Sequence, residues 1–457
     1  MNNHQAMGSN KKKVLRASFF VIFGFGMSQV IRLASNIILT RLLVPEFFGI
    51  MAICNVVILG INLFSDIGIA QGIIRSPRGH EPDFVNTAYT LQVIRGGILF
   101  ILLLIASYPI SVFYEQRQIL YILPVIGLNT IIQGFISTSL ILFSKDLQQG
   151  KVNLIELTAQ GMTALLTITL AYFLRNVWAL VFGTLFTSLI KMVMSHLFKS
   201  EVKNQFILEK KAVHELLSFG KWIFLSTMMT FFASQADRLI IGKIFTLSFF
   251  GVYNIALMLS DLPKQIIAKI SRQVLYPLIS KYSDLSRDEL RSKMTKQRRI
   301  IVYPLALCVS VFACFGDFLI LFLYDNRYDA ASWILPLLVI GIWPLVLYST
   351  VDMSLLAIGK PKYLALGNFI KFLYMIIFIP LFYRIWGIFG AIIAVVLNDI
   401  PVYIVILVSL VRERLSFLKQ DLCVTVIFLL LISVFMLLRS FLGLGLPGEA
   451  AYYAMGL

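Results

Sequence analysis

Long apolar segments separated by short polar ones run along the whole chain. A membrane-spanning helix needs roughly 20 mostly apolar residues, and thirteen segments approach or exceed that length. They must be helices, because a bilayer offers no partners for backbone N–H and C=O groups, and they are too continuous to be alternating barrel strands. The thirteen segments are 17–39, 48–74, 84–108, 119–143, 152–174, 176–198, 217–241, 249–279, 300–323, 333–358, 363–383, 386–410 and 421–439. This pattern predicts an all-α integral membrane protein with 13 transmembrane helices, within a range of 12 to 14.

The longer polar segments divide these spans into groups. Residues 199–216 lie between the sixth and seventh spans, near the middle of the chain. We therefore expect two pseudo-symmetric six-helix lobes and a further helix after the second lobe. The expected divisions are a cytoplasmic N-terminal segment at 1–16, an N-terminal lobe at 17–198, a cytoplasmic inter-lobe linker at 199–216, a C-terminal lobe at 217–410 and a trailing helix and tail at 411–457.

A short polar hairpin occurs twice. Residues 40–49 read TRLLVPEFFG and residues 242–251 read GKIFTLSFFG, so each copy places a basic residue before Phe-Phe-Gly at an offset of 202 residues. The alternative to a true repeat is chance similarity, because apolar segments use few kinds of residue. Because six spans separate the copies, both have the same expected orientation, as in transporters built from two parallel repeats about an axis along the membrane normal.

Composition and charge place these segments in a bilayer. Hydrophobic residues make up 59% of the chain and charged residues 14%, against about 45–50% and about 25% in soluble proteins. The net charge of +17 is concentrated in alternate polar segments, which begin with Lys11, Lys12, Lys13 and Arg16. Cytoplasmic loops of membrane proteins carry an excess of Lys and Arg. We therefore expect a cytoplasmic N-terminus, a retained first span and no nucleic-acid partner.

One stretch resembles a known family. Residues 36–75, NIILTRLLVPEFFGIMAICNVVILGINLFSDIGIAQGIIR, are similar to the opening hairpin of the bacterial polysaccharide transporter family, which contains the Wzx-type flippases of lipid-linked oligosaccharides. The matching positions are Thr40, Arg41, Leu42, Leu43, Pro45, Glu46, Phe48, Gly49, Phe64, Ser65, Asp66 and Gly68. This family belongs to the multidrug/oligosaccharidyl-lipid/polysaccharide exporter superfamily, together with MATE drug exporters and lipid II flippases. Its members usually have twelve or fourteen spans, whereas this sequence shows thirteen.

The resemblance implies a central cavity between two lobes that opens alternately to the cytoplasm and to the outside. It implies a flippase or exporter, not an enzyme, that moves an undecaprenyl-pyrophosphate-linked oligosaccharide across the bacterial inner membrane. An O-antigen, capsule or exopolysaccharide repeat unit is the expected glycan. Membrane lipids and polysaccharide polymerase or assembly proteins are the expected partners, a monomer suffices, and no cofactor is expected beyond H⁺ or Na⁺ as a coupling ion.

Basic residues inside the spans are candidate ligands for the pyrophosphate. Charges within the hydrocarbon region are costly and usually face a cavity or a partner, and the planar guanidinium of Arg donates paired hydrogen bonds to phosphate. The candidates are Arg32, Arg95, Lys264, Lys269, Arg272 and Lys371. Three alternatives remain open. Arg32 could pair with Asp66 across the first hairpin. Arg272 could reach the lipid headgroups, and Asp261 could neutralise Lys264 three residues further on.

Acidic and amide residues inside the spans are candidates for binding a coupling ion. A carboxylate buried away from water has a raised pKa and can titrate near neutrality. The candidates are Asp66, Asp352, Asn398 and Asp399. The segment LNDIP at 397–401 also contains Pro401, which frees a backbone carbonyl for a cation, although a kink with one cavity-facing acid is the simpler alternative. Asp237-Arg238 is interpreted as an interfacial salt bridge in preference to a gate.

Three functions compete for this sequence. The many basic residues within spans favour an anionic, lipid-linked cargo, whereas a cation-coupled drug antiporter of the MATE kind is expected to present mainly acids. A membrane polymerase or ligase commonly needs a sizeable outer loop with catalytic groups, and the expected outer loops are short. We therefore expect a flippase of lipid-linked oligosaccharide, with the drug antiporter as the alternative.

Overall fold

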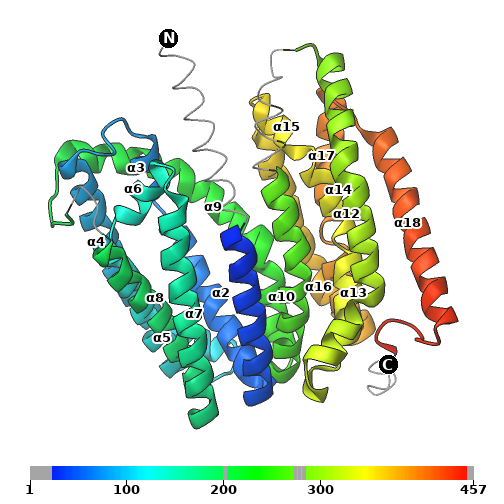
Figure 1. Ribbon diagram of the computed structural model, residues 1–457, viewed down its shortest axis with the longest axis horizontal. Coiled ribbons are helices and arrows are strands. Elements are labelled where there is room, and N and C mark those ends of the chain that lie inside the picture. The colour runs from blue at the N-terminus through cyan, green and yellow to red at the C-terminus, as the bar shows by residue number, and fades with distance from the viewer. Residues whose placement is uncertain (1–22, 199–202, 272–274, 276–278, 280–284, 450–457) are drawn as a thin grey trace. The chain divides into compact units, whose positions relative to one another are not determined.

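The computed structural model describes residues 23–198, 203–271, 275, 279 and 285–449, and in this part of the chain every regular element is a helix (Figure 1). The chain divides into two compact units, Met1–Met228 and Met229–Leu457. The N-terminal segment 1–16 lies outside the described residues. The predicted divisions between lobes, linker and tail stay predictions.

The described residues of the first unit form eight helices and the first part of a ninth. The apolar segments of the sequence predict their positions, because each helix overlaps one predicted span. They are a helix at 23–42, α2 (Pro45–Phe64), α3 (Ile69–Arg75), α4 (Pro82–Phe113), α5 (Ile119–Gly134), α6 (Ser139–Lys145), α7 (Gln149–Leu174), α8 (Trp178–Leu197) and α9 (Lys210–Ile244), which continues into the second unit.

The second unit contains the remaining described helices. They are α10 (Leu247–Ile270), α12 (Arg287–Leu323), the 3₁₀ turn η2 (Asn326–Tyr328), α13 (Ala331–Ile340), α14 (Trp343–Ser349), α15 (Asp352–Ala357), α16 (Lys362–Val396), α17 (Ile400–Arg412) and α18 (Leu418–Phe441). α12 packs against α13 and α18, and α16 packs against α17. The chain is therefore an all-α, multi-pass membrane protein.

The number of membrane crossings depends on whether helices that contain several charged residues are counted as spans. By length and composition, eight described helices could cross a membrane, or nine if the bent pair α5–α6 is one span. α9 and α10 are not in this set, and in α10 the charged residues Asp261 and Lys264 lower the hydropathy. The predicted count of 13 counts both helices as spans and stays a prediction.

The repeated hairpin has the same geometry in both copies. The helix at 23–42 ends at residue 42 and α2 begins at Pro45; α9 ends at Ile244 and α10 begins at Leu247. Both boundaries are therefore shifted by the 202 residues that the sequence motif indicates. α2 starts with a proline, which suits a first helical turn, whereas Thr246 caps α10 by accepting a hydrogen bond from the backbone N–H of Phe249.

Several predicted spans are broken helices. α2 and α3 are separated at 65–68, where Gly68 has a φ of 66°, and α5 meets α6 at an angle of 59°. The tenth predicted span consists of α13, α14 and α15, and the twelfth is interrupted at 397–399 between α16 and α17. A kink at Trp386 and Gly387 marks the predicted boundary between the eleventh and twelfth spans. The sequence analysis treated most of these spans as continuous, because hydrophobicity alone does not reveal a break.

Two buried ion pairs hold the helices of the second unit together. Arg439 of α18 donates to both carboxylate oxygens of Asp317 on α12, at 2.8 and 2.9 Å. Arg298 of α12 lies 2.5 Å from Asp421 of α18 and also donates to the hydroxyl of Thr350. These four charged side chains are nearly inaccessible to solvent. Because removing one partner would leave a buried charge uncompensated, they tie α18 firmly to α12.

α4 and α5 approach closely at one of two adjacent glycines. A Cβ atom at Gly96 would lie 2.5 Å from the backbone oxygen of Thr130, whereas nothing lies within 4 Å of a Cβ at Gly97. The hydroxyl of Thr130 donates to the backbone oxygen of Gly96 at 3.0 Å. The close approach therefore requires glycine at residue 96 and not at residue 97.

We expect Gly96→Ala to destabilise the protein by about 1–3 kcal/mol, because the added methyl group forces α4 and α5 apart. Gly97→Ala is the matched control, and we expect it to stabilise the helix by up to about 1 kcal/mol through reduced chain entropy. Thermal unfolding of the purified protein in detergent measures both changes. Equal shifts for the two variants would contradict this packing.

Candidate functional site

Three polar cavities lie within the described residues, two in the first unit and one in the second. The first, the Arg32 cavity, has a volume of about 500 Å³. The second, the Arg95 cavity, measures about 370 Å³. The third, the Asp399 cavity, measures about 490 Å³. Each is lined by helices of a single unit, so each can be described independently of the other unit.

The Arg32 cavity lies among the helix at 23–42, α2, α7 and α8. Arg32 is the charged side chain among the described lining residues, and its guanidinium donates to the side-chain oxygen of Gln29. The hydroxyl of Ser28 donates to the amide oxygen of Gln160 at 2.7 Å across the cavity wall. Its neutral polar lining residues are Ser28, Ser35, Asn36, Asn55, Gln160, Thr163, Thr167, Thr184 and Thr187.

This lining suits an anion that carries hydroxyl groups. One guanidinium provides paired donors for a phosphate, and hydroxyl and amide groups can both donate to and accept from a sugar. Arg32, a predicted pyrophosphate ligand, is exposed to the cavity. The alternative pairing of Arg32 with Asp66 gains no support, because Asp66 lines the Arg95 cavity, while Arg32 lines its own.

The Arg95 cavity forms where two helices are broken. Arg95 of α4 donates from Nε to the hydroxyl of Ser65 at 3.0 Å and from Nη2 to the backbone oxygen of Asn62 at 2.7 Å. These groups lie where α2 ends, and helix ends have carbonyls without intrahelical partners. Asp66 accepts from the backbone N–H of Gly68 at 2.9 Å within the same break.

Gln92 has the equivalent role one helical turn earlier, on the same face of α4. Its side-chain nitrogen lies 3.2 Å from the backbone oxygen of Gln133, 3.0 Å from that of Gly134 and 3.0 Å from that of Ile136. These oxygens lie at the break between α5 and α6. From one helix, Gln92 and Arg95 therefore donate hydrogen bonds to backbone oxygens at two helix breaks. The predicted binding of pyrophosphate by Arg95 stays a prediction, and the structure gives this guanidinium a second, structural role.

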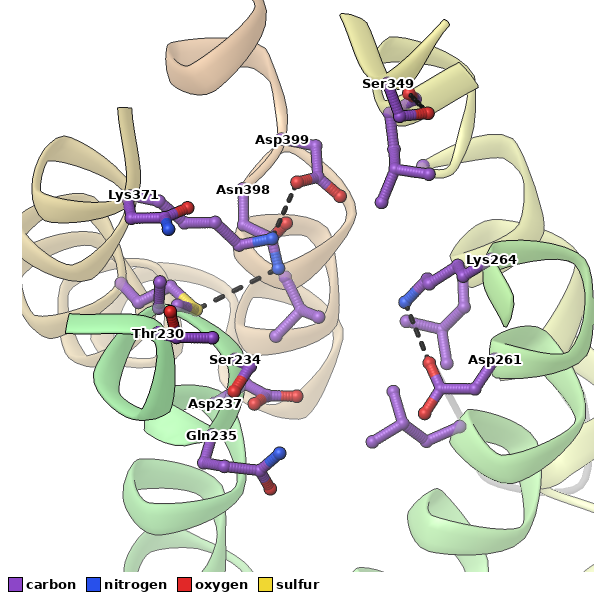
Figure 2. Close-up of a pocket in the computed structure, with 18 of the residues that line it drawn as sticks. Thr230, Ser234, Gln235, Asp237, Asp261, Lys264, Ser349, Lys371, Asn398 and Asp399 are labelled. Atoms are coloured by element: carbon purple, nitrogen blue, oxygen red, sulfur yellow. Dashed lines mark hydrogen bonds and ion pairs between the residues drawn. The ribbon is translucent and has the colours of Figure 1, made fainter. Parts of the chain in front are cut away.

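The Asp399 cavity is lined by α9, α10, α13, α14, α16 and the break before α17 (Figure 2). Its described lining carries three basic and three acidic side chains, so their formal charges cancel. They are Arg238, Lys264, Lys371, Asp237, Asp261 and Asp399. The sequence analysis placed Lys264 and Lys371 among pyrophosphate ligands and Asp399 among ion ligands, and the structure brings these three into one cavity.

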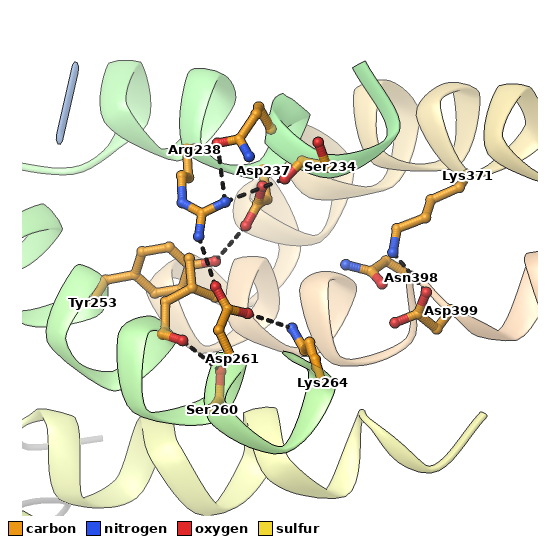
Figure 3. A network of polar contacts seen from close by, with 12 residues as sticks. Ser234, Asp237, Arg238, Tyr253, Ser260, Asp261, Lys264, Lys371, Asn398 and Asp399 are labelled. Atoms are coloured by element: carbon orange, nitrogen blue, oxygen red, sulfur yellow. Dashed lines mark hydrogen bonds and ion pairs between the residues drawn. The ribbon is translucent and has the colours of Figure 1, made fainter. Parts of the chain in front are cut away.

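One network in this cavity connects α9 to α10 (Figure 3). Asp261 lies 3.0 Å from a guanidinium nitrogen of Arg238 and 3.1 Å from the ammonium of Lys264. The hydroxyl of Tyr253 donates to Asp237 at 3.0 Å. The alternative that Asp261 neutralises Lys264 is therefore confirmed. Asp237 and Arg238 both line the cavity, and Arg238 forms its salt bridge with Asp261 of α10. The interfacial position of this bridge stays a prediction.

Asp399 forms a second network at the break between α16 and α17. It is the residue that precedes α17, where the positive end of the helix dipole favours a carboxylate, and its side chain is 4% exposed. One carboxylate oxygen accepts from the ammonium of Lys371 at 2.6 Å and from the hydroxyl of Tyr348 at 3.1 Å. The amide nitrogen of Asn398 lies 3.9 Å from the sulfur of Met375.

The remaining candidates do not join these three cavities. Lys269 lies in the last turn of α10 and Asp352 in the first turn of α15, and neither is among the described residues that line them. Arg272 lies outside the described residues. Sequence reasoning missed Gln92, Gln160, Tyr253 and Tyr348, because a neutral polar residue in a span gives no signal until its partner on another helix is known.

The Arg32 and Asp399 cavities use equivalent positions of the repeated hairpin. Six residues of the helix at 23–42 line the first cavity, and for five of them the residue 202 positions later on α9 lines the second. The pairs are Ser28 and Thr230, Ile31 and Ala233, Arg32 and Ser234, Ser35 and Asp237, and Asn36 and Arg238. The repeat therefore extends beyond the turn motif to the cavity wall.

Comparison with known proteins gives consistent matches. The profile of a family described as "Polysaccharide biosynthesis protein" matches residues 38–333. A Klebsiella pneumoniae protein described as an uncharacterized membrane protein in the cps region is 25% identical over 391 residues, which cover 84% of this chain and 77% of that protein. The lipopolysaccharide biosynthesis protein WzxC of Escherichia coli (strain K12) is 21% identical over 282 residues, 62% of this chain and 56% of WzxC.

A solved structure shows the same fold. The inward closed conformation of the lipid II flippase MurJ superposes with a TM-score of 0.71 at 14% sequence identity, over 92% of each chain. At that identity the likeness establishes the fold alone. The family match, which covers well over half of the chain, confirms the resemblance that residues 36–75 indicate.

The capping role of Arg95 can be tested by a double-mutant cycle. We expect Arg95→Met and Ser65→Ala each to lower stability, and the double variant to lose less than the sum, with a coupling of about 1–2 kcal/mol for a charge-assisted hydrogen bond. Thermal unfolding in detergent measures the cycle. Strictly additive losses would show that the hydrogen bond from Arg95 to Ser65 does not stabilise the break at the end of α2.

Proposed function

Because this chain belongs to the polysaccharide biosynthesis protein family, we propose that it is a flippase for undecaprenyl-pyrophosphate-linked oligosaccharide. It moves the lipid-linked repeat unit from the cytoplasmic to the outer leaflet of the bacterial inner membrane, with its N-terminus in the cytoplasm. The names of WzxC and of the lipid II flippase MurJ support a cargo built of sugars on a lipid carrier. The proposal includes no covalent step.

The Arg32 cavity carries this proposal. It has one cationic side chain among neutral hydroxyl and amide groups, which matches a cargo with one anionic linkage and many hydroxyl groups. A guanidinium is weakly hydrated and binds phosphate through two parallel hydrogen bonds. Arg32 therefore binds the pyrophosphate, and residues such as Asn55 and Gln160 bind the sugars next to it.

The Asp399 cavity is less suited to the pyrophosphate. Its three basic side chains are matched by three carboxylates, so an incoming anion would have to replace existing ion pairs. Breaking such pairs in a poorly solvated site is costly. In this proposal Lys264 and Lys371 compensate carboxylates within the protein and do not bind the pyrophosphate.

Transport follows from alternating access. A cavity that opens first to one leaflet and then to the other lets the polar headgroup cross without exposure to hydrocarbon, while the undecaprenyl chain stays in lipid. Two parallel repeats that move as units are a common plan for this motion. The cargo shifts the equilibrium only if it binds the two conformations with different affinity, and H⁺ or Na⁺ coupling stays open within the proposal.

The experiment measures translocation in liposomes. The protein is reconstituted with a fluorescent undecaprenyl-pyrophosphate oligosaccharide, and a membrane-impermeant quencher reports the labelled lipid that reaches the outer leaflet. We expect Arg32→Gln to lower the initial rate at subsaturating lipid by about ten- to hundredfold, because one charge-assisted contact of about 1.5–3 kcal/mol is lost.

Arg41→Gln is the matched control. Arg41 lies at the end of the same helix, is exposed, and does not line any of the three cavities, so we expect wild-type rates. Equal losses in the two variants would remove Arg32 from the site. Failure of the wild type to move any lipid-linked glycan, together with proton-driven efflux of a cationic dye, would favour the drug antiporter.

A further inference from the structure

Asp399 has a buried carboxylate, and the burial of a charged group costs free energy. Its side chain is almost inaccessible to solvent and lies at the break between α16 and α17 (Figure 2). A buried carboxylate stays ionised only if a cation or strong donors compensate it. The helix dipole of α17 and the hydroxyl of Tyr348 contribute part of this compensation, and a full positive charge must supply the rest.

The surroundings of Asp399 contain the ligands that a small metal cation prefers. Asn368, Asn398 and Ser349, whose side chains carry amide and hydroxyl oxygens, line the same cavity. Carboxylate and amide oxygens are typical ligands of hard cations. From these ligands alone, the break would be expected to bind Na⁺.

The ammonium group of Lys371 occupies this position instead. It lies 2.6 Å from Asp399, and it is the cation that the described residues place in hydrogen-bond contact with this carboxylate. Lys371 is on α16 and lies 28 residues before Asp399, so the pair connects the body of α16 to the break at its own end. A tethered ammonium provides the charge of a monovalent cation without being lost to solution.

We propose that Lys371 is the resident cation of the Asp399 site, so that the wild-type protein needs no Na⁺ there. Removal of the Lys371 ammonium exposes the carboxylate and its neighbouring oxygens and converts the break into a Na⁺ site. This inference concerns the second unit and does not depend on the cargo in the proposed function. Its test measures ion binding and stability, so its failure is distinguishable from a failure of the flippase assignment.

Lys264 provides a matched control within the same cavity. Its partner Asp261 also pairs with Arg238 at 3.0 Å (Figure 3). Removal of the Lys264 ammonium therefore leaves Asp261 with a cation, whereas removal of the Lys371 ammonium leaves Asp399 without one in contact. The two variants delete the same group from the same cavity and differ in whether the carboxylate that was in contact keeps a cation in contact with it.

The experiment uses the full-length protein purified in detergent. Its melting temperature is measured in NaCl and in N-methylglucamine chloride at equal ionic strength, and binding of ²²Na⁺ is measured in parallel. We expect a difference below about 1 °C for the wild type and for Lys264→Ala. For Lys371→Ala we expect the melting temperature to be at least about 3 °C higher in Na⁺, with saturable ²²Na⁺ binding.

Asp399→Asn in the Lys371→Ala background is expected to abolish both effects, because the anionic ligand is lost. Lys371→Gln retains a neutral donor to Asp399 and replaces Lys371→Ala in the test if the alanine variant does not fold. Sodium-specific stabilisation of the wild type that Asp399→Asn removes would overturn the proposal. So would a folded Lys371 variant that neither binds ²²Na⁺ nor is stabilised by Na⁺, or a response of Lys264→Ala as large as that of Lys371→Ala.

Discussion

The need to satisfy backbone polar groups away from water controls the architecture of this chain. An unbroken helix satisfies its own backbone, but a broken one leaves carbonyls and N–H groups that lipid cannot pair. The first unit solves this with two side chains on one face of α4: Arg95 donates to the end of α2, and Gln92 donates to the end of α5. The cavity at these breaks exists because α4 supplies the missing partners. A polar residue in a span is therefore first a structural requirement, and only then a candidate ligand.

Charges within the second unit obey the same constraint through pairing. Asp317 is matched by Arg439, Asp261 by Arg238 and Lys264, and Asp399 by Lys371. Apart from the local pair of Asp261 and Lys264, each of these pairs joins different helices or distant turns, so it also determines which elements stay together. The density of basic residues in spans is thus a weak guide to an anionic cargo, because most of those seen in this unit already have a carboxylate. The Arg32 cavity is the better guide, since its neutral polar lining complements a single cation.

The sequence predicted the helices and the repeat well, and the sites only in part. Hydrophobic runs determine helix positions because lipid exposure demands them, and the hairpin motif predicted the 202-residue offset that the helix boundaries show. Partners were harder to predict: Arg95 reaches Asn62, 33 residues away, and Lys371 reaches Asp399, 28 residues away. Asp261 and Lys264, three residues apart on one helix face, form the pair that local spacing could reveal. The sequence did not reveal that Asp261 is a partner of Arg238, because Asp261 lies on the next helix.

The duplicated hairpin shows how one scaffold can serve two purposes. Equivalent positions of the helix at 23–42 and of α9 line a cavity in each unit, yet Arg32 corresponds to Ser234, and Ser35 and Asn36 correspond to Asp237 and Arg238. Both copies begin and end their helices at equivalent positions, so the backbone polar groups at the turn need partners in both. The side chains that face the cavities differ between the two copies: one wall carries a single basic side chain, and the other carries an acidic and a basic one. A cavity whose described lining has one cationic and many neutral polar side chains suits an anion, whereas a cavity with internal ion pairs resists one and stabilises its own helices. In the proposed function, this difference is the physical reason to place cargo binding in the first unit and internal charge compensation in the second.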